Sequence, residues 1–273
     1  MEPLRPLTLG ELLDRTFQLY RNNFALFAGI TALGYLPLFL GRLGLVVVPG
    51  AVQRPGVAFS ATMLVGLLTV LVLYFIGMAA AQAGTVVAVS YVHLGRPITV
   101  RQSYAYVRSM VGRVILVMIG VGIGVTIGLI LLIVPGIIFF LMWALAIPVT
   151  VLEGASLGEA VSRSRMLTAG HRGRVFLVYL VFTMLAFALG AALETPLAFL
   201  IVLKRDSPAI LSLVQVAGVV TSYLSQVLVS PLITIALSLM YFDERVRKEA
   251  LDIDLMVRNL ETEQGQSAAA PAL

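Results

Sequence analysis

Long apolar stretches alternate along the chain with short segments in which apolar and polar residues recur at helical spacing. Three of these amphipathic segments begin with the same pattern, a Ser or Thr followed three residues later by Glu or Gln, at Thr8, Thr99 and Ser156. In such a capping box the hydroxyl accepts a hydrogen bond from a first-turn N–H, and the later side chain accepts one from the N–H of the capping residue. The pattern predicts three elbow helices, each lying along a membrane face and leading into a transmembrane hairpin.

Six apolar runs have lengths that suit a membrane, since a helical span needs about 20 apolar residues. The runs cover 24–40, 57–93, 114–134, 137–152, a fifth stretch from 175 to near 204, and 209–242. We therefore predict an all-α polytopic membrane protein with six transmembrane helices and three cytoplasmic amphipathic elbow helices. The three elbow-and-hairpin units are either a pseudo-threefold repeat or elbows that recur because they suit any polytopic protein.

The second and fourth runs do not have the usual length of a span. The second contains 37 residues, which is roughly 55 Å of helix against a hydrocarbon core of about 30 Å. It is expected either to project from the bilayer or to break near Gly77 or Gly84. Pro135 and Gly136 predict a tight turn before the short fourth run.

The sixth run contains Pro231, which predicts a kink because proline leaves a helix carbonyl unpaired. A charged segment follows, in which the pairs Asp243/Arg247 and Glu244/Lys248 favour continuation of the helix out of the membrane. We expect residues 1–258 to form a single integral membrane helical domain and residues 259–273 to form a disordered tail.

Composition agrees with this class of fold. The chain is 59% hydrophobic and 12% charged, whereas soluble domains carry about 25% charged residues, and its mean hydropathy is +0.99. There are no cysteines, which excludes disulfides and thiolate metal sites. The net charge of +5 comes with no run basic enough for a nucleic-acid site, so no nucleic-acid partner is expected.

The distribution of basic residues predicts the orientation. Of the 19 Lys and Arg residues, those on the side away from the elbows are Arg42, Arg54, Lys204 and Arg205. The others accompany the elbows and the two termini. The positive-inside rule then places both termini and all three elbows in the cytoplasm of a multi-pass protein of the cell (inner) membrane.

Familiar catalytic patterns are missing from the sequence. Neither His93 nor His171 has a partner at metal-ligand spacing, and no nucleotide-binding loop or nucleophile elbow occurs. Glu194 is the acidic residue inside an apolar run, about 30 Å of helix from Arg174, which places it at the outer interface. We therefore expect no catalytic residues, no metal site and no cofactor.

Two groups of polar residues are candidate sites. The first is a polar midplane site between the second and sixth helices, comprising Gln82, Ser225, Gln226, Ser230 and Thr234. These side chains suit either interhelical hydrogen bonding or a solute pathway. The second is a cytoplasmic patch around the third elbow, comprising Glu153, Arg163, Arg165, His171, Arg172 and Arg174. The patch suits contact with anionic headgroups, or an ion pair in which Glu153 fixes an elbow arginine.

An ordered set of motifs spans about residues 7 to 255. The motifs are 9–17, 19–24, 134–136, Pro148, 152–154, 160–165 with Leu167 and Gly170, and 241–243 with Arg245, Arg247, Lys248, Glu249 and Asp252. This set resembles the bacterial glycerophosphoryl diester phosphodiesterase membrane-domain family, with departures at Glu244 and Ala250, where an apolar residue and a glycine are expected.

The resemblance implies a six-helix integral membrane domain. In some members of that family the domain precedes a catalytic phosphodiesterase barrel, and stand-alone members are mostly of uncharacterised function. Only about 30 residues follow the sixth run, so we expect no barrel here, and the resemblance predicts no enzyme activity.

Two functional hypotheses follow. In the first, the chain is a non-enzymatic membrane protein whose cytoplasmic elbows and charged C-terminal helix interact with anionic lipid, with a protein partner or with another copy of the chain. In the alternative, it is a small-solute or lipid transporter that uses the polar midplane site.

Overall fold

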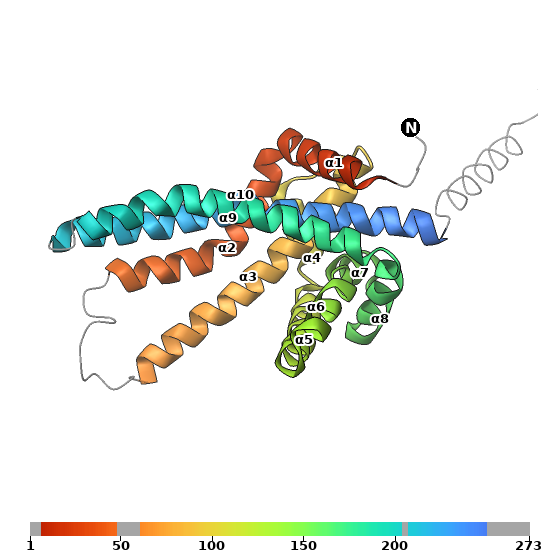
Figure 1. Cartoon of the computed structure of the whole chain (residues 1–273), viewed down its shortest axis with the longest axis horizontal. Coiled ribbons are helices and arrows are strands. Elements are labelled where there is room, and N and C mark those ends of the chain that lie inside the picture. The colour runs from red at the N-terminus through yellow and green to blue at the C-terminus, as the bar shows by residue number, and fades with distance from the viewer. Residues whose placement is uncertain (1–6, 48–60, 204–206, 250–273) are drawn as a thin grey trace, which may run out of the picture.

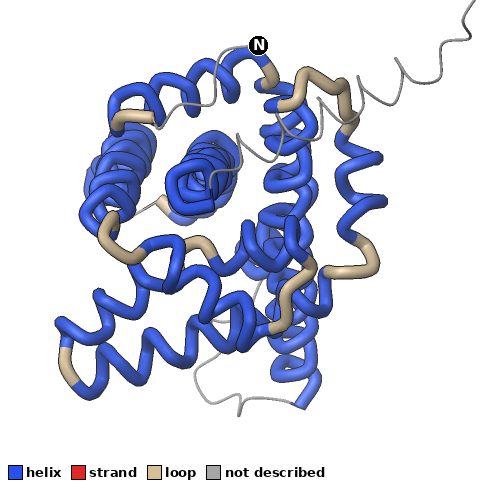
Figure 2. Tube along the Cα trace, turned by 90° about the vertical axis from the view of Figure 1, so that its right-hand side faces the viewer, coloured by secondary structure: helices blue, strands red, loops and turns tan. Residues whose placement is uncertain are grey.

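A computed structural model describes residues 7–47, 61–203 and 207–249, and every regular element in this part of the chain is a helix (Figure 2). The helices are α1 (Leu9–Asn22), α2 (Phe24–Val47), α3 (Ala61–His93), α4 (Val100–Val107), α5 (Val111–Leu131), α6 (Ile133–Met142), α7 (Ala146–Glu153), α8 (Leu157–Thr168), α9 (Arg172–Leu203) and α10 (Pro208–Glu249). The predicted tail 259–273, Ala250, Arg54, Lys204 and Arg205 lie outside the described residues.

The three elbow helices are confirmed as α1, α4 and α8, and each begins with the predicted capping box. The N–H groups of Thr8, Thr99 and Ser156 donate to the Glu or Gln three residues later at 2.8, 2.9 and 2.8 Å. The hydrogen bonds from Ser156 stabilise the carboxylate of Glu159 and lower its pKa.

Six segments in the described residues are long and apolar enough to cross a membrane, as predicted. They are Phe24–Val46, Leu64–His93, Val111–Leu131, Ile133–Glu153, Arg172–Leu203 and Ile210–Glu249. The third begins earlier than expected, because α4 ends at Val107 and Val111 belongs to α5.

Of the two alternatives for the second membrane helix, projection from the bilayer or a break near Gly77 or Gly84, the break is wrong, because α3 is continuous from Ala61 to His93. Gly77 instead lies against Gly34 of α2, and a Cβ on either glycine would meet the backbone of the other. The missing side chains therefore allow close contact between two helices and do not interrupt one of them.

The predicted turn at Pro135 and Gly136 is also wrong. The chain turns at Leu132, which is extended (φ −161°, ψ 141°), and α6 begins at Ile133. Proline fits the first turn of a helix because its missing N–H would have no intrahelical partner there. A Cβ on Gly128 would lie 2.9 Å from the Cα of Gly136, so this glycine pair brings α5 and α6 together.

The fourth span is interrupted, which the sequence did not indicate. It comprises α6 and α7, separated by residues 143–145. The sixth span, in contrast, is one helix of 42 residues that continues through Pro231 and out to Glu249, as the charged segment predicted.

The longest helix, α10, runs almost along the line of sight in Figure 2 and contacts α1, α2, α3, α7, α8 and α9. Three antiparallel hairpins pair α2 with α3, α5 with α6, and α9 with α10, and α3 and the α5/α6 hairpin diverge from the α9/α10 pair (Figure 1). Burial concentrates toward the elbow end of the bundle. Along α3, for example, large side chains are exposed from Leu64 to Ile76, whereas most residues from Ala79 to Val89 are buried.

All three elbows lie at one end of the bundle, where Leu7 at the start of α1 contacts the end of α10. The two ends of the described chain therefore share one side, as six spans require. The cytoplasmic orientation of that side and the pseudo-threefold relation between the hairpins stay predictions.

Candidate functional site

The break between α6 and α7 is held by hydroxyl groups of α8. Ser164 Oγ accepts from the N–H of Leu145 at 3.1 Å and donates to the carbonyl of Met142 at 2.9 Å. Thr168 Oγ1 donates to the same Met142 carbonyl at 3.1 Å. Both side chains are fully buried. Backbone groups freed by the break are therefore satisfied by side chains, as they must be within a membrane-spanning region.

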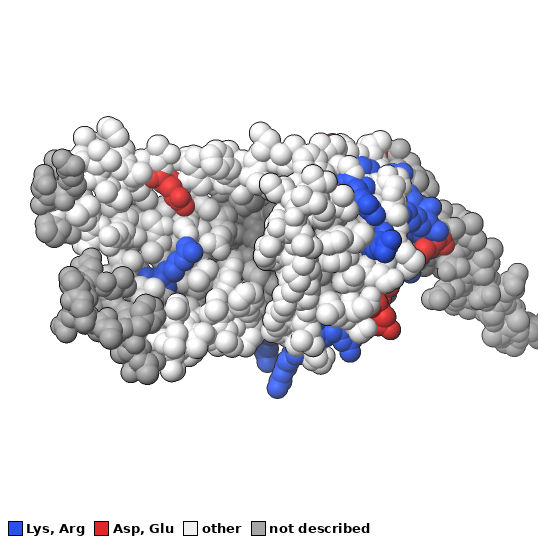
Figure 3. Space-filling view, turned by 60° about the horizontal axis from the view of Figure 1, so that its bottom comes forward, with Lys and Arg blue, Asp and Glu red and all other residues white. Residues whose placement is uncertain are grey.

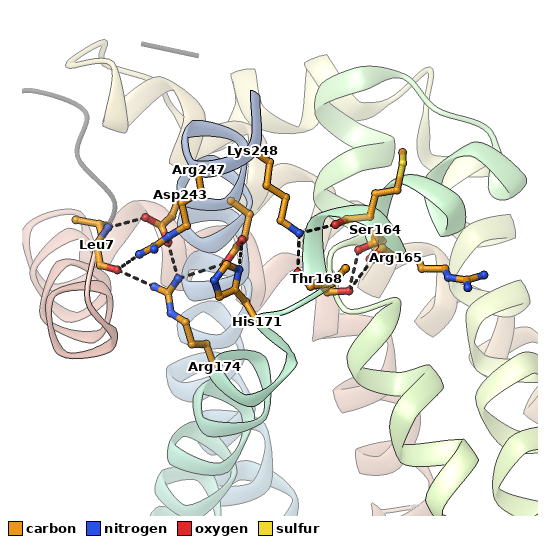
Figure 4. Close-up of polar contacts among 12 residues, drawn as sticks. Leu7, Ser164, Arg165, Thr168, His171, Arg174, Asp243, Arg247 and Lys248 are labelled. Atoms are coloured by element: carbon orange, nitrogen blue, oxygen red, sulfur yellow. Dashed lines mark hydrogen bonds and ion pairs between the residues drawn. The ribbon is translucent and has the colours of Figure 1, made fainter. Parts of the chain in front are cut away.

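Two buried carboxylates lie at the end of α10, facing the start of α9 (Figure 4). Arg174 Nη1 donates to Asp243 Oδ2 at 2.8 Å and to Glu244 Oε1 at 3.2 Å. His171 Nδ1 lies 2.9 Å from Glu244 Oε2. Arg247 Nε donates to Asp243 Oδ2 at 3.0 Å, which confirms the predicted i,i+4 pair.

The same cluster holds the segment that enters α1. The N–H of Leu7 donates to Asp243 Oδ1 at 2.6 Å, and the carbonyl of Leu7 accepts from Arg174 at 2.9 Å and from Arg247 at 2.5 Å (Figure 4). Asp243 therefore joins α1, α9 and α10 at this end of the bundle.

The second predicted pair, Glu244/Lys248, is wrong because both side chains have other partners. Glu244 is fully buried against His171 and Arg174. Lys248 Nζ donates to the carbonyls of Met166 and Ala169 at 2.6 and 2.7 Å, at the end of α8. A cation at this position satisfies the carbonyls that a helix C-terminus leaves unpaired.

A further network joins α7, α8 and α10. Arg163 Nε donates to Glu153 Oε2 at 3.0 Å, and Arg163 Nη2 pairs with Glu249 Oε1. Tyr241 donates to Glu153 Oε1 at 2.7 Å. Glu153 therefore forms the ion pair with an elbow arginine that was one of the two interpretations of this patch, and the arginine is Arg163. Burial lowers the pKa of Arg163, but the hydrogen bonds and charges of Glu153 and Glu249 together outweigh it, so that the pKa is raised.

The patch around the third elbow is consequently a network of paired charges at four of its six members, Glu153, Arg163, His171 and Arg174. Arg163, His171 and Arg174 contact carboxylates, whereas Arg165 is exposed and Arg172 Nε is buried without a hydrogen-bond partner in the described structure. Basic side chains are most frequent toward the right of the face shown in Figure 3, where acidic side chains lie among them, and charged side chains of both signs also lie near the left end. Sequence reasoning missed the acids of α10 because they lie about 70 residues from their partners on α9.

A cavity of about 220 Å³ lies among α3, the break before α7, α7, α9 and α10. It is lined by Gln82, Ala144, Ile147, Pro148, Tyr179, Ser230, Ile233, Thr234 and Leu237. The structure thus brings together Gln82, Ser230 and Thr234 of the predicted midplane site and adds Tyr179, which the sequence did not single out.

The polar groups of this cavity are incompletely paired. Ser230 Oγ lies 3.0 Å from the hydroxyl of Tyr35, and Thr234 Oγ1 lies 3.5 Å from the carbonyl of Ser230. The amide of Gln82 and the hydroxyl of Tyr179 have no hydrogen-bond partner among the described residues. The cavity therefore offers free donors and acceptors within a mainly apolar wall.

The other predicted midplane residues lie elsewhere. Gln226 lines a separate cavity of about 10 Å³ beside Arg42, Ser222 and Tyr223, a volume close to that of one water molecule. Ser225 Oγ is buried without a partner in the described structure. The predicted cluster of five is therefore divided: Gln82, Ser230 and Thr234 share one cavity, Gln226 lines the other, and Ser225 lines neither of the two. Glu194 is exposed on α9.

Within the described ranges no group of three or more His, Cys, Asp or Glu residues could hold a metal ion. Comparisons with protein-family models, with curated proteins and with solved structures find no match. The six apolar helices, the elbows at one end and the cavity between the hairpins define the class of the chain, a polytopic α-helical membrane protein.

Proposed function

We propose that this chain is a non-enzymatic membrane protein that takes an uncharged, hydrogen-bonding amphiphile from the bilayer into the Gln82 cavity, as a small-solute or lipid carrier. The observation that carries the proposal is the amide of Gln82, which lines the cavity without a hydrogen-bond partner among the described residues. An unpaired amide in an apolar medium costs several kcal/mol, so a ligand or water that pairs with it is favoured.

The depth of Gln82 supports this function. It lies 11 residues from His93 at the elbow end of α3, which is about 16 Å of helix. The hydrocarbon core is about 30 Å thick, so the amide is near its middle. Polar residues at such depth usually mark a substrate pathway or an interhelical contact, and Gln82 makes no such contact in the described structure.

The lining indicates the chemistry of the ligand. None of the cavity residues carries a charge, and the polar groups are one amide and three hydroxyls. A charged ligand would be unpaired there, at high cost. Hydroxyl, ester and amide groups match these partners, with hydrocarbon against Ile147, Ile233 and Leu237.

The size of the cavity limits what can enter. Pockets for drug-sized ligands usually measure roughly 300–1,000 Å³, so 220 Å³ suits a small solute or one end of a lipid.

The hypothesis of interaction through the third elbow is less favoured by this geometry. Arg163 and Arg174 are paired with carboxylates of the same chain, so much of the patch is already neutral. Membership of the glycerophosphoryl diester phosphodiesterase membrane-domain family stays a prediction, and the proposed function does not depend on it.

A binding measurement with matched variants tests the proposal. Trp143 is the one tryptophan of the chain and precedes Ala144, which lines the cavity, so its fluorescence can report binding. We expect saturable titrations with dioctanoylglycerol or octanol in nanodiscs. Gln82→Leu removes one neutral hydrogen bond and should weaken binding about three- to tenfold, without lowering the melting temperature, because the unpaired amide is lost.

Gln226→Leu is the matched control, since it makes the same change in the separate small cavity. It should leave the titration unchanged. Lack of a saturable signal with both probes in the wild-type protein, or equal effects of the two substitutions, would contradict the proposal.

A further inference from the structure

About half of the chain, from Arg15 to Leu152, carries basic but no acidic residues. No Asp or Glu occurs between Asp14 and Glu153. Basic residues of this region that lie around the second elbow therefore have no acidic neighbour in sequence. They are Arg96, Arg101, Arg108 and Arg113.

Three of these arginines are free at the surface. Arg101 and Arg108 are exposed, and their spacing of seven residues places them on one side of α4, while Ser103 and Val107 are buried. Arg96 is exposed in the turn before α4. The side chains of Arg96, Arg101 and Arg108, which we call the arginine surface, have no ion pair or hydrogen bond within the described residues.

The fourth arginine differs from them. Arg113 Nη1 donates to the carbonyl of Gly154 at 2.5 Å. The third elbow differs as well, because Arg163 is paired with Glu153 and Glu249. Arg96, Arg101 and Arg108 are therefore a group of unpaired arginines around the second elbow, while Arg21 of the first elbow and Arg165 of the third are also exposed without an ion pair among the described residues.

Apolar side chains lie beside the arginine surface. Leu94 in the preceding turn is 66% exposed, and Tyr106 of α4 is 53% exposed. A short helix that exposes apolar and aromatic groups together with arginines is typical of the boundary between headgroups and acyl chains. This combination suits a lipid surface better than an acidic protein, because a bilayer provides both anions and hydrocarbon.

We propose that the arginine surface binds the headgroups of anionic phospholipids in the leaflet that faces the elbows. The guanidinium group matches a phosphate with two parallel hydrogen bonds, and no carboxylate among the described residues pairs with these three side chains. The site is separate from the Gln82 cavity and does not rest on the function proposed for it.

Native mass spectrometry in detergent tests the proposal, with phosphatidylglycerol and phosphatidylcholine as the probes. A basic residue near an anionic surface contributes about a fivefold change in affinity. The triple variant R96Q/R101Q/R108Q should therefore lose at least tenfold in phosphatidylglycerol affinity, with no change for phosphatidylcholine. The loss should shrink in high salt, which screens exposed charges.

Three controls make the outcome specific. R96K/R101K/R108K keeps the charges and should retain most of the preference, and Arg42→Gln removes an arginine at the other end of the bundle and should have no effect. Gln82→Leu should also leave the preference intact, which separates this proposal from the cavity.

Equal phosphatidylglycerol affinity in the wild-type and triple-Gln proteins would overturn the proposal. So would a wild-type protein that shows no phosphatidylglycerol preference but binds soluble polyglutamate, because the surface would then dock an acidic protein. Unchanged melting temperatures show that the variants are folded.

Discussion

Ser164 and Thr168 supply the hydrogen bonds that the break between α6 and α7 removes from the backbone. Their hydroxyls contact Met142, at the end of α6, and Leu145, the last residue of the break. Ala144, between those two residues, lines the Gln82 cavity. Two small polar side chains of an elbow helix therefore position one wall of the proposed binding site.

Ser164→Ala tests this role. The substitution leaves the buried N–H of Leu145 without its partner, which should destabilise the protein by roughly 1–3 kcal/mol. We expect a melting temperature several degrees lower and weaker binding of dioctanoylglycerol. Ser162→Ala changes an exposed serine of the same helix and should be nearly neutral. Equal melting temperatures for the two variants would refute the role assigned to Ser164.

Among the elements, the elbow helices were predictable and the interruptions were not. A capping box is a local signal, and all three helices begin where it occurs. Glycine and proline are ambiguous, because the same residues can end a helix or allow two helices to approach. At Gly77 and at Pro135–Gly136 the packing determines the outcome, and packing is not visible in one sequence.

The contact between α2 and α3 gives a prediction at the scale of the element. Gly77→Ala places a Cβ against the backbone of Gly34, and such overpacking usually costs about 1–3 kcal/mol. The melting temperature should therefore fall. Gly66→Ala lies on the same helix with nothing within 4 Å of the added Cβ, and it should be neutral or stabilising, by up to about 1 kcal/mol of helix propensity. Thermal unfolding by circular dichroism distinguishes the two, and a stabilising Gly77→Ala would contradict the close contact.

For the whole molecule, the lengths of the apolar runs predicted six spans, and an even number of spans places both ends of the chain on one side. The lengths of apolar runs can be read directly from the sequence because they are local features. The composition of the two candidate sites could not be read in this way, because it depends on contacts between segments that are distant in sequence. Gln82 and Thr234 could be placed at similar depth by counting residues, but Gln226 could not be separated from them, because depth does not determine the side of a helix. Tyr179 could not be identified as a cavity residue from the sequence, because a tyrosine within an apolar run is ordinary in a membrane helix.

The central claim is that an open cavity lies beside Thr234 in the middle of the bundle. The chain contains no cysteine, so Thr234→Cys introduces one thiol in the cavity wall. Ser238→Cys, one turn along α10, is the matched control because Ser238 is fully buried and exchanges a hydroxyl for a thiol in the same way.

The rate of reaction of these two thiols with N-ethylmaleimide in nanodiscs is the most direct test. The cavity predicts that Thr234→Cys reacts at least tenfold faster than Ser238→Cys, since only the cavity thiol can be reached, and that saturating dioctanoylglycerol slows it. Equal reactivity of the two thiols, or a Thr234→Cys thiol that does not react, would contradict the cavity and the function proposed for it.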